Sequence, residues 1–310
     1  MLELTCILFV AFLVDLFIGD PRYRYHPIKI IGQSISFLEK VLRKVGCSGR
    51  SGGVLLVITV VAAFVTLYLA ISFALHRIHF LLGICFDFYA CYSCLAIGDL
   101  INHVRPVIHA LESGKLTEAK ESIALIVGRD VRFLDEKGVC RAAVETLAEN
   151  FVDGFLSPLF WCLMGAILAN LLGLSPVKTA MSFMLAFKVA STLDSMIGYR
   201  NPEYIDFGLA GARLDDMMNF VPARFSLIIL FIGAGFSGFH PVRGLKVAMR
   251  DRLKHDSPNA AHAESFVAGA LDIRLAGPVK YPDALKNKPW LGNGNPDPGP
   301  VHIKKTVRLV

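Results

Sequence analysis

The feature that most constrains this chain is a long stretch without charge. Residues 53–75 (GVLLVITVVAAFVTLYLAISFAL) contain no Asp, Glu, Lys or Arg. A helix needs ~20 apolar residues to cross a bilayer, so this stretch is long enough to span one. Only 19% of the whole chain is charged, whereas an average soluble domain is nearer ~25%. Residues 53–75 are therefore predicted to form a transmembrane helix.

The apolar residues are concentrated in a few runs. Further apolar runs occupy 2–18, 79–97, 154–174 and 177–193. The first contains Asp15 and the second contains Asp87. The opening run lacks a basic start and a small-residue cleavage site, so we expect a retained helix and not a signal peptide. Together the runs predict an integral membrane protein with about five transmembrane helices and the lipid bilayer as its surroundings.

Polar stretches separate these runs, and their charge predicts a topology. They cover 19–52, 98–150, 194–224 and 240–310. The first carries seven Lys and Arg against two acids, which favours the cytoplasm because cytoplasmic loops are enriched in basic residues. The run 225–239 (FSLIILFIGAGFSGF) is short and rich in glycine, which is typical of a re-entrant segment. We therefore expect all four polar stretches to be cytoplasmic.

The remaining patterns predict an all-α fold. Residues 100–125 show helical periodicity with Gly114 as a stop, and 139–150 indicate another helix. Residues 286–300 are rich in Gly and Pro and predict a loop. No strand-like alternation of any length is present. We expect one integral membrane domain over 1–310, elaborated by cytoplasmic helices.

Three acids at four-residue spacing are unusual at the start of an apolar run. Glu145, Glu149 and Asp153 occur in "RAAVETLAENFVDGFLSPLFW". Residues four apart share one face of a helix, and like charges so placed destabilise it by roughly 0.2–0.5 kcal/mol per pair. A bound cation relieves that repulsion. Alternatively, the acids cap the helix or simply face water.

Other polar clusters lie at the edges of apolar runs. They are "GDPRYRYHP" (19–27), "GRD" (128–130), "KVASTLDSMIGYRN" (188–201), "ARLDDMMNFVPAR" (212–224) and "HDSPNAAHAES" (255–265). Carboxylates on two helices suit Mg²⁺, which takes one or two of them together with waters and substrate phosphates. Arginines nearby suit phosphate oxygens. The chain has no G-x-x-x-x-G-K-[ST], G-x-S-x-G or H-E-x-x-H motif, which argues against a P-loop and the common hydrolase and zincin mechanisms. The pattern indicates a cytoplasm-facing, Mg²⁺-dependent enzyme acting on phosphorylated substrates, without naming them.

These same stretches resemble a known family. "GDPRYRYHPIKIIG", "VGRD", "RAAVETLAENFVDGFLSPLFW", "KVASTLDSMIGYRNPEYIDFGLAGARLDDMMNFVPAR" and "SPNAAHAESFVAGALDIRLAGPVKY" are similar to motifs of the adenosylcobinamide-phosphate synthases (the CbiB/CobD type) of cobalamin biosynthesis. The motifs occur in the family's order, from about residue 12 to about residue 292. One local departure is His262, where the motif usually has an aromatic residue.

The resemblance implies an enzyme of the inner membrane that works late in the cobalamin pathway. Such an enzyme is an ATP-dependent carbon–nitrogen ligase. It joins a carboxylate of adenosylcobyric acid to the amine of aminopropanol phosphate, using ATP and Mg²⁺. Its expected partners are the corrinoid, aminopropanol phosphate, ATP and other late-pathway membrane enzymes, and no nucleic acid is expected.

The resemblance also suggests roles for individual residues. The candidate metal and nucleotide-phosphate ligands are Glu145, Glu149, Asp153, Asp215 and Asp216. The candidate catalytic residues are His26, Lys188 and Asp194. The candidate substrate- and phosphate-binding residues are Arg129, Asp130, Arg200, Arg213, Asn219, Arg224, Ser257, Asn259 and Glu264.

Two other classes of protein remain open. A membrane phosphotransferase or prenyltransferase also places acid pairs and Mg²⁺ at helix ends, and "LDDMMN" alone fits it. That reading predicts a lipid substrate. A transporter or assembly protein without enzymatic activity instead makes the intramembrane Asp15 and Asp87 the important residues.

Overall fold

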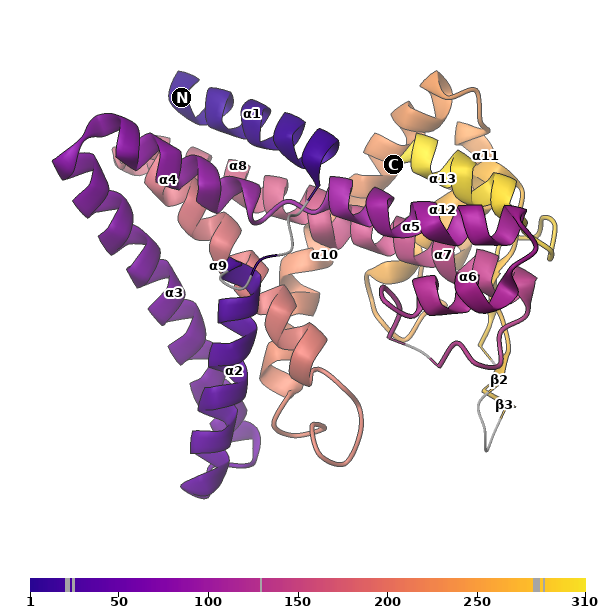
Figure 1. Ribbon diagram of the computed structural model, residues 1–310, viewed down its shortest axis with the longest axis horizontal. Coiled ribbons are helices and arrows are strands. Elements are labelled where there is room, and N and C mark those ends of the chain that lie inside the picture. Colours follow the sequence, from indigo (N-terminus) through magenta and orange to yellow (C-terminus); the bar gives the residue numbers. More distant parts are fainter. Residues whose placement is uncertain (20–22, 24–25, 129, 281–284, 287) are drawn as a thin grey trace. The chain divides into compact units, whose positions relative to one another are not determined.

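A computed structural model describes the chain except residues 20–22, 24–25, 129, 281–284 and 287. The described part is almost entirely helical, with only short two-residue strands (Figure 1). The all-α prediction is confirmed. The described residues cluster into two compact units. The first unit comprises Met1–Ala96 and Gly154–Met218, and the second comprises Ile97–Asp153 and Asn219–Val310.

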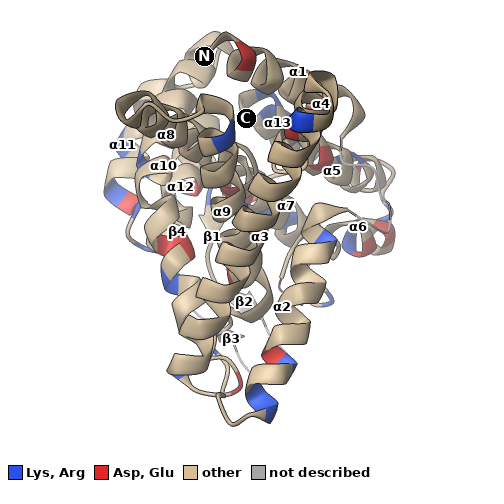
Figure 2. Cartoon of the chain, turned by 90° about the vertical axis from the view of Figure 1, so that its left-hand side faces the viewer, with Lys and Arg blue, Asp and Glu red and all other residues tan. Residues whose placement is uncertain are grey.

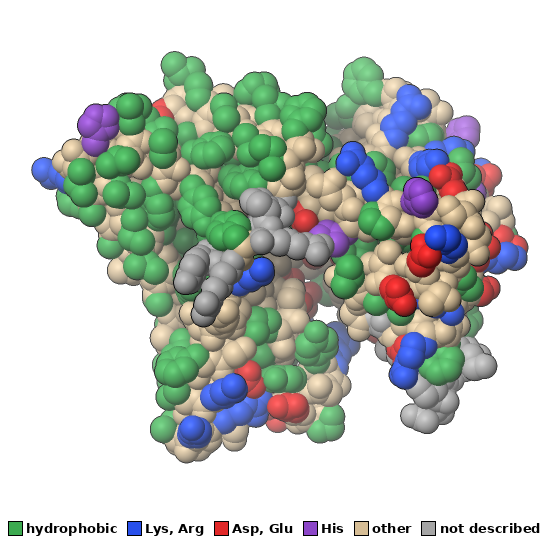
Figure 3. All heavy atoms as spheres, viewed as in Figure 1, with side chains coloured by type: hydrophobic (Ala, Val, Ile, Leu, Met, Phe, Trp, Pro, Cys, Tyr) green, Lys and Arg blue, Asp and Glu red, His purple; other side chains and the backbone are tan. Residues whose placement is uncertain are grey.

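The first unit is built mainly from apolar helices. Its helices are α1 (Leu2–Ile18), α2 (Pro27–Lys44), α3 (Arg50–Ile78), α4 (Phe80–Tyr92), α8 (Ser157–Leu172), α9 (Pro176–Ile197) and the first part of α10 (Leu209–Phe236). Charged positions gather at the last turns of α2, while most of α3 is uncharged (Figure 2). Hydrophobic side chains cover the visible faces of α1, α3 and α4 (Figure 3). Exposed apolar surface of this extent fits contact with lipid.

Several helices are long and apolar enough to cross a membrane. The described residues contain four such segments, at Arg50–Ile78, Glu136–Leu172, Pro176–Ile197 and Leu209–Phe236. A fifth is added if α4 and α5 (Ile97–Glu112), which are bent by 41°, form one broken span. The prediction of a multi-pass membrane protein with about five spans is confirmed at this level.

The apolar run 225–239 does not stand alone. It continues α10, a helix of 28 residues that starts at Leu209 and contains Pro222. The prediction treated this run as too short to span, but the helix that contains it is long enough. Proline inside the helix removes one backbone hydrogen bond, which transmembrane helices tolerate. The shortness of the run 225–239 therefore no longer supports a re-entrant segment, because α10 as a whole is long and apolar enough to cross a membrane.

Local chemistry sets the helix ends of the first unit. Pro27 occupies the first position of α2, and His26 Nδ1 accepts a hydrogen bond from the Ile28 N–H at 3.3 Å. Helices α8 and α9 approach closely because Gly165 faces the backbone of Thr179 and Ala180. Cys91 and Cys94 are buried and free in the core of this unit.

In the second unit, two helices are mostly buried, α7 (Glu136–Phe151) and α12 (Ala260–Leu271). The other elements of this unit are α5 (Ile97–Glu112), α6 (Leu116–Ile123), the rest of α10, α11 (Pro241–Asp251), α13 (Pro300–Leu309) and strands β1 (Leu275–Ala276), β2 (Val279–Lys280), β3 (Leu285–Lys286) and β4 (Trp290–Leu291). Every residue of α12 is buried. A π-helix, Val152–Leu156, follows α7 directly.

The strands form two short antiparallel ladders, and only part of them lies in the stretch 286–300 that was predicted to be a loop. Strand β1 pairs with β4, and β2 pairs with β3. Residues 286–300 are therefore not entirely loop, because the last residue of β3 and both residues of β4 lie in that stretch. Gly114 ends the helical stretch at α5 with a φ of +70°, as expected of a glycine stop.

Candidate active site

Helix α7 carries two of the three acids that the sequence singled out. Asp135 caps it by accepting a hydrogen bond from the Gly138 N–H at 2.7 Å. Glu145 is buried and Glu149 is half-buried, one turn apart on the same helix. Asp153 lies in the π-helical turn and not in α7 itself. Single π-helical turns occur frequently at functional sites, so the π-helix at this end of α7 fits a functional site there.

A polar pocket opens beside these acids, entirely within the second unit. Its volume is about 200 Å³. Its lining residues are Ile126, Val127, Gly128, Glu145, Thr146, Glu149, Asn150, His255, Glu264, Ala276 and Lys288. The pocket therefore brings together carboxylates from α7 and α12 with a lysine and a histidine. Since drug-sized ligands occupy roughly 300–1,000 Å³, this space suits a phosphate group with an ion and waters and not a whole corrinoid.

The wall of the pocket is fixed by an unusual backbone. Glu145 Oε1 accepts a hydrogen bond from the Ala276 N–H at 2.7 Å. Ala276 has a φ of +57°, a left-handed conformation that is rare for residues other than glycine. Such conformations persist where the surrounding structure holds them. Glu145 thus has a structural partner in addition to any role toward a ligand.

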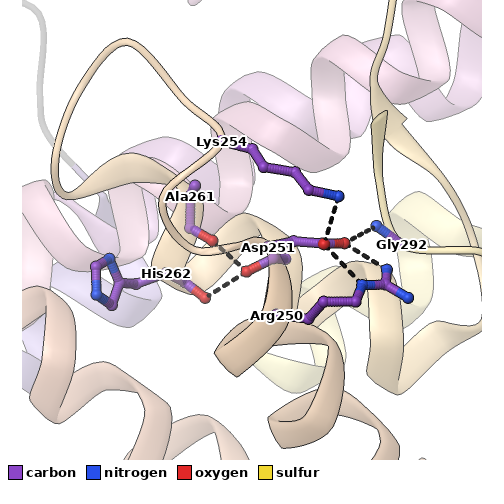
Figure 4. A network of polar contacts seen from close by, with 7 residues as sticks. Arg250, Asp251, Lys254, Ala261, His262 and Gly292 are labelled. Atoms are coloured by element: carbon purple, nitrogen blue, oxygen red, sulfur yellow. Dashed lines mark hydrogen bonds and ion pairs between the residues drawn. The ribbon is translucent and has the colours of Figure 1, made fainter. Parts of the chain in front are cut away.

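A buried carboxylate anchors the strand on the other side of Ala276. Asp251, at the end of α11, accepts hydrogen bonds from Arg250 at 2.7 and 2.5 Å and from the Gly292 N–H at 2.8 Å (Figure 4). Lys254 lies 2.6 Å from it. Burial by itself would raise the pKa of Asp251, but these donors outweigh it and hold the pKa well below its ordinary value. Gly292 follows β4 directly, so Asp251 holds the β1–β4 ladder that presents Ala276.

The pocket fits Mg²⁺ only together with a ligand. Within the described residues, no three His, Cys, Asp or Glu side chains are grouped so that they hold a metal ion by themselves. Mg²⁺ commonly takes one or two protein carboxylates and completes its shell with waters and substrate phosphates. Glu145 and Glu149 supply the carboxylate oxygens that this ion prefers.

A second group of predicted residues in this unit centres on Asn259. Arg224 donates a hydrogen bond to Asn259 Oδ1 at 3.2 Å, and its guanidinium lies 3.4 Å from the Phe220 ring centroid. Ser257 Oγ accepts a hydrogen bond from the Asn259 N–H at 3.2 Å. The Ser257 hydroxyl is thus used in the turn before α12, where the sequence suggested contact with substrate.

His262, on the first turn of α12, is fully buried behind this group. Its Nδ1 lies 3.2 Å from the Asn259 carbonyl oxygen. Burial, and then the positive charges of Arg224 and Arg252, lower the pKa of His262 to about 4. The ring is therefore neutral at pH 7.

The other predicted residues of this unit lie elsewhere. Asn219 is buried in α10. Asp130 is bound by Arg132 at 2.7 Å, and the side-chain and backbone hydrogen bonds from Arg132 lower the pKa of Asp130 to about 2. Arg129 lies outside the described residues.

The first unit holds its own group of predicted residues. Asp194, near the end of α9, is repelled by the negative charge of Asp216 on α10. Asp216 is in turn attracted by the positive charges of Arg213 and Arg200. Arg213 and Arg200 are exposed, and Asp215 is half-buried. The structure thus gathers these predicted residues at the ends of α9 and α10.

The two remaining predicted residues of the first unit are placed differently. Lys188 is half-buried within α9, and His26 is buried where it caps α2. The predicted residues are therefore divided between the two units, and several of them lie outside the groups described above.

Sequence reasoning missed several residues of the pocket. Thr146 and Asn150 stand next to the predicted acids on α7, and His255 lies in the quoted "HDSPNAAHAES" stretch, so residue type was their only signal. Lys288 lies in a stretch rich in Gly and Pro that gave no sign of a site.

The fold and the pocket define a multi-pass, all-α membrane protein with a carboxylate-lined pocket of phosphate size. Comparison with known proteins narrows this class. Residues 8–310 match the family model described as CobD/Cbib protein. The chain therefore belongs to the CobD/CbiB family. No solved structure matches it significantly.

Curated relatives agree over nearly the whole chain. "Cobalamin biosynthesis protein CobD" of Pelobacter propionicus is 39% identical over 93% of this chain and 84% of the relative. The protein of the same name from Citrobacter koseri is 37% identical over 97% of this chain and 91% of the relative. "Cobalamin biosynthesis protein CbiB" of Salmonella typhimurium is 36% identical over the same shares. The predicted family is confirmed.

Proposed function

We propose that this protein acts in cobalamin biosynthesis as an adenosylcobinamide-phosphate synthase. In this reaction an amide bond forms between a carboxylate of adenosylcobyric acid and the amine of aminopropanol phosphate, with ATP and Mg²⁺. The names of the relatives support the pathway. The observation that carries the reaction class is the pocket of the second unit, where carboxylates, Lys288 and His255 surround a space of phosphate size.

The chemistry requires activation of the corrinoid carboxylate. One carboxylate oxygen attacks the γ-phosphorus of ATP, which forms an acyl phosphate and releases ADP. The amine nitrogen then attacks the acyl carbon, the C–N bond forms, and inorganic phosphate leaves while the nitrogen loses a proton. Most of the catalysis in phosphoryl transfer is positioning and charge neutralisation.

The residues of the pocket suit those tasks. Glu145 and Glu149 would hold Mg²⁺, which supplies charge neutralisation to the phosphate oxygens when bound. Lys288 supplies a further positive charge to them. His255 Nδ1 accepts a hydrogen bond from the Ser257 N–H at 3.0 Å, so the neutral ring carries its proton on Nε2 and can donate it to a phosphate oxygen.

The amine proton needs an acceptor near the pocket. Glu264 lines it and is only 4% exposed. A buried carboxylate in this position is a suitable general base. The corrinoid ring itself exceeds the pocket, so we place only its reacting carboxylate there.

The location of the enzyme belongs to the same proposal. We place it in the inner membrane, with the pocket facing the cytoplasm, where ATP is available. The basic content of residues 19–52 supports this orientation. Other membrane enzymes of the late cobalamin pathway are expected neighbours.

The test uses the purified full-length protein in detergent. It is incubated with adenosylcobyric acid, ATP, Mg²⁺ and aminopropanol phosphate, and the amide product and ADP are measured by mass spectrometry and coupled assay. Product that requires all four components is the expected result. ATP consumption without amide, or phosphoryl or prenyl transfer to a lipid, would contradict the proposal.

Glu149→Gln tests the metal-binding role inside that assay. The change keeps the size of the side chain but removes its charge. We expect slower turnover and a higher Mg²⁺ requirement, with the unliganded protein no less stable because like-charge repulsion on α7 falls. Glu121→Gln, at an exposed position on α6, is the matched control. A lower melting temperature with an unchanged Mg²⁺ requirement would show that Glu149 has only a structural role.

A further inference from the structure

Helix α11 presents faces of three different chemical characters. Its buried side consists of Gly244, Val247, Ala248 and Asp251. This side lies against α12, and Gly244 is required there because a Cβ would come within 2.9 Å of the Phe266 ring. The position of α11 in the second unit is therefore fixed by close packing, and its outward faces are defined.

The face opposite the buried side is apolar and exposed. Val242, Leu245 and Met249 are 57%, 37% and 54% exposed, and Leu253, just after the helix, is 71% exposed. Successive spacings of three and four residues place them on one stripe. At 100° per residue this stripe lies roughly 150° around the helix from the buried side. An apolar stripe that faces away from the core leaves much of its surface exposed, without a partner in the core of the unit.

A basic flank borders the apolar stripe. Residues 241–254 contain five Lys and Arg against one acid, Asp251. Arg243, Lys246 and Arg250 lie side by side on the helix between the apolar stripe and the core, and all three are exposed. Arg243 is bound to Asp272 and Arg250 to Asp251, so the flank keeps a net positive charge after these pairs are counted.

The helix is also held close to a membrane span. Helix α10 ends at Phe236, which is 88% exposed, and α11 begins at Pro241. Five residues of extended chain reach at most ~18 Å, so the start of α11 cannot leave the neighbourhood of the bilayer surface if α10 is inserted. An amphipathic helix with a basic border is the type that lies in the plane of a membrane interface.

We propose that α11 lies on the surface of the bilayer that holds α10. The Val242, Leu245, Met249 and Leu253 stripe enters the boundary between headgroups and acyl chains. The basic flank, with Lys246 as its unpaired member, binds the phosphates of anionic phospholipids. The lipid surface is thereby a binding partner of the second unit, independent of the reaction in the pocket.

The test uses the full-length protein in nanodiscs, with single labelled cysteines. Cys6, Cys47 and Cys85 are replaced by Ser, because the remaining cysteines are buried. Leu245→Cys and Met249→Cys are then labelled with an environment-sensitive fluorophore, and Glu121→Cys on α6 is the matched control. The lipid is phosphatidylcholine, alone or mixed with phosphatidylglycerol.

The expected result is specific to position and lipid. Labels at 245 and 249 should be quenched by lipid-borne nitroxide and protected from aqueous iodide, more strongly with phosphatidylglycerol, while the control label behaves in the opposite way. Lys246→Gln should weaken the effect of phosphatidylglycerol without changing the melting temperature. Iodide quenching equal to the control, no response to phosphatidylglycerol, or energy transfer between labels of two copies would each overturn the proposal.

Discussion

The contacts of Asp251 lead to a quantitative prediction about the second unit. This buried carboxylate connects the end of α11 to Gly292 and so to the β1–β4 ladder beside the pocket. Asp251→Ala removes every one of these contacts. Asp251→Asn removes the charge but keeps an oxygen that can accept from the Gly292 N–H. The two variants therefore separate the ionic part of the interaction from the hydrogen bond.

The expected loss of stability in the Asp251 variants follows from how exposed the partners of Asp251 are. Arg250 and Lys254 are 43% and 40% exposed, so solvent screens both ion pairs and each contributes roughly 0.5–1 kcal/mol. The buried bond from the Gly292 N–H to a charged acceptor is worth about 1.5–3 kcal/mol. We expect Asp251→Ala to cost about 3 kcal/mol and Asp251→Asn about 1–2 kcal/mol. In a domain of this size, 3 kcal/mol lowers Tm by roughly 6–12 °C.

The assay uses a thiol that is already in the unit. Cys140 on α7 is buried, so a thiol-reactive fluorophore reports its exposure as the detergent-solubilised protein is heated. The same measurement on Cys140→Ala gives the labelling of the other cysteines. The difference between the two signals therefore reports unfolding of the second unit. Asp297→Asn is the matched control, because it breaks an ion pair with Lys137 whose side chains are 52% and 48% exposed.

Either of two melting results would contradict this role of Asp251. If Asp251→Ala melts at the same temperature as Asp297→Asn, the carboxylate does not hold the ladder. If the Asn and Ala variants melt together below the control, the charge and not the Gly292 contact supplies the stability. Because the pKa of Asp251 is held low, its contribution should persist at pH 5 and be lost only as the pH falls below ~3.9, the ordinary value for Asp.

Three further predictions concern other parts of the chain. The pKa of His262 in the folded protein, about 4, lies below the ordinary 6.5. The stability of the protein should therefore be full above pH 6.5 and fall by roughly 3 kcal/mol as the pH drops to 4. His262→Phe should remove this pH dependence of the melting temperature, and a dependence like that of the parent would contradict the prediction. Arg213→Lys keeps the charge but loses the planar fork, so its activity in the proposed ligase reaction should be nearly as low as that of Arg213→Ala. Parent-like activity would limit Arg213 to an electrostatic role. Reporters fused after residues 115 and 250 should both be cytoplasmic, because one pocket is lined from both stretches, while a fusion at residue 203 on the opposite side would show that α10 crosses.

The sequence predicted the overall character of the fold because that character depends on local composition. Uncharged runs such as 53–75 are helices in a bilayer whatever surrounds them. Gly114 ended its helix because a left-handed residue ends a helix locally. The boundary at Arg224 was misjudged, since charge marks polarity and not the end of a helix, and α10 continues through it.

The candidate site was predictable only where residue type and spacing carried the signal. Glu145 and Glu149 were found from their four-residue spacing on one helix. Lys288, His255 and the Ala276 backbone could not be found, because they reach the pocket through chain folding over more than a hundred residues and no local pattern records that.

The residues alone were enough to predict a helical membrane protein with acids at the start of an apolar run. Which of those acids share a pocket became known from the folded chain. It placed Glu264 with Glu145 and Glu149, and it gave Ser257 a role in a turn. The physical reason is that helix formation and membrane insertion depend on neighbours in sequence, whereas a binding site depends on which buried surfaces pack together.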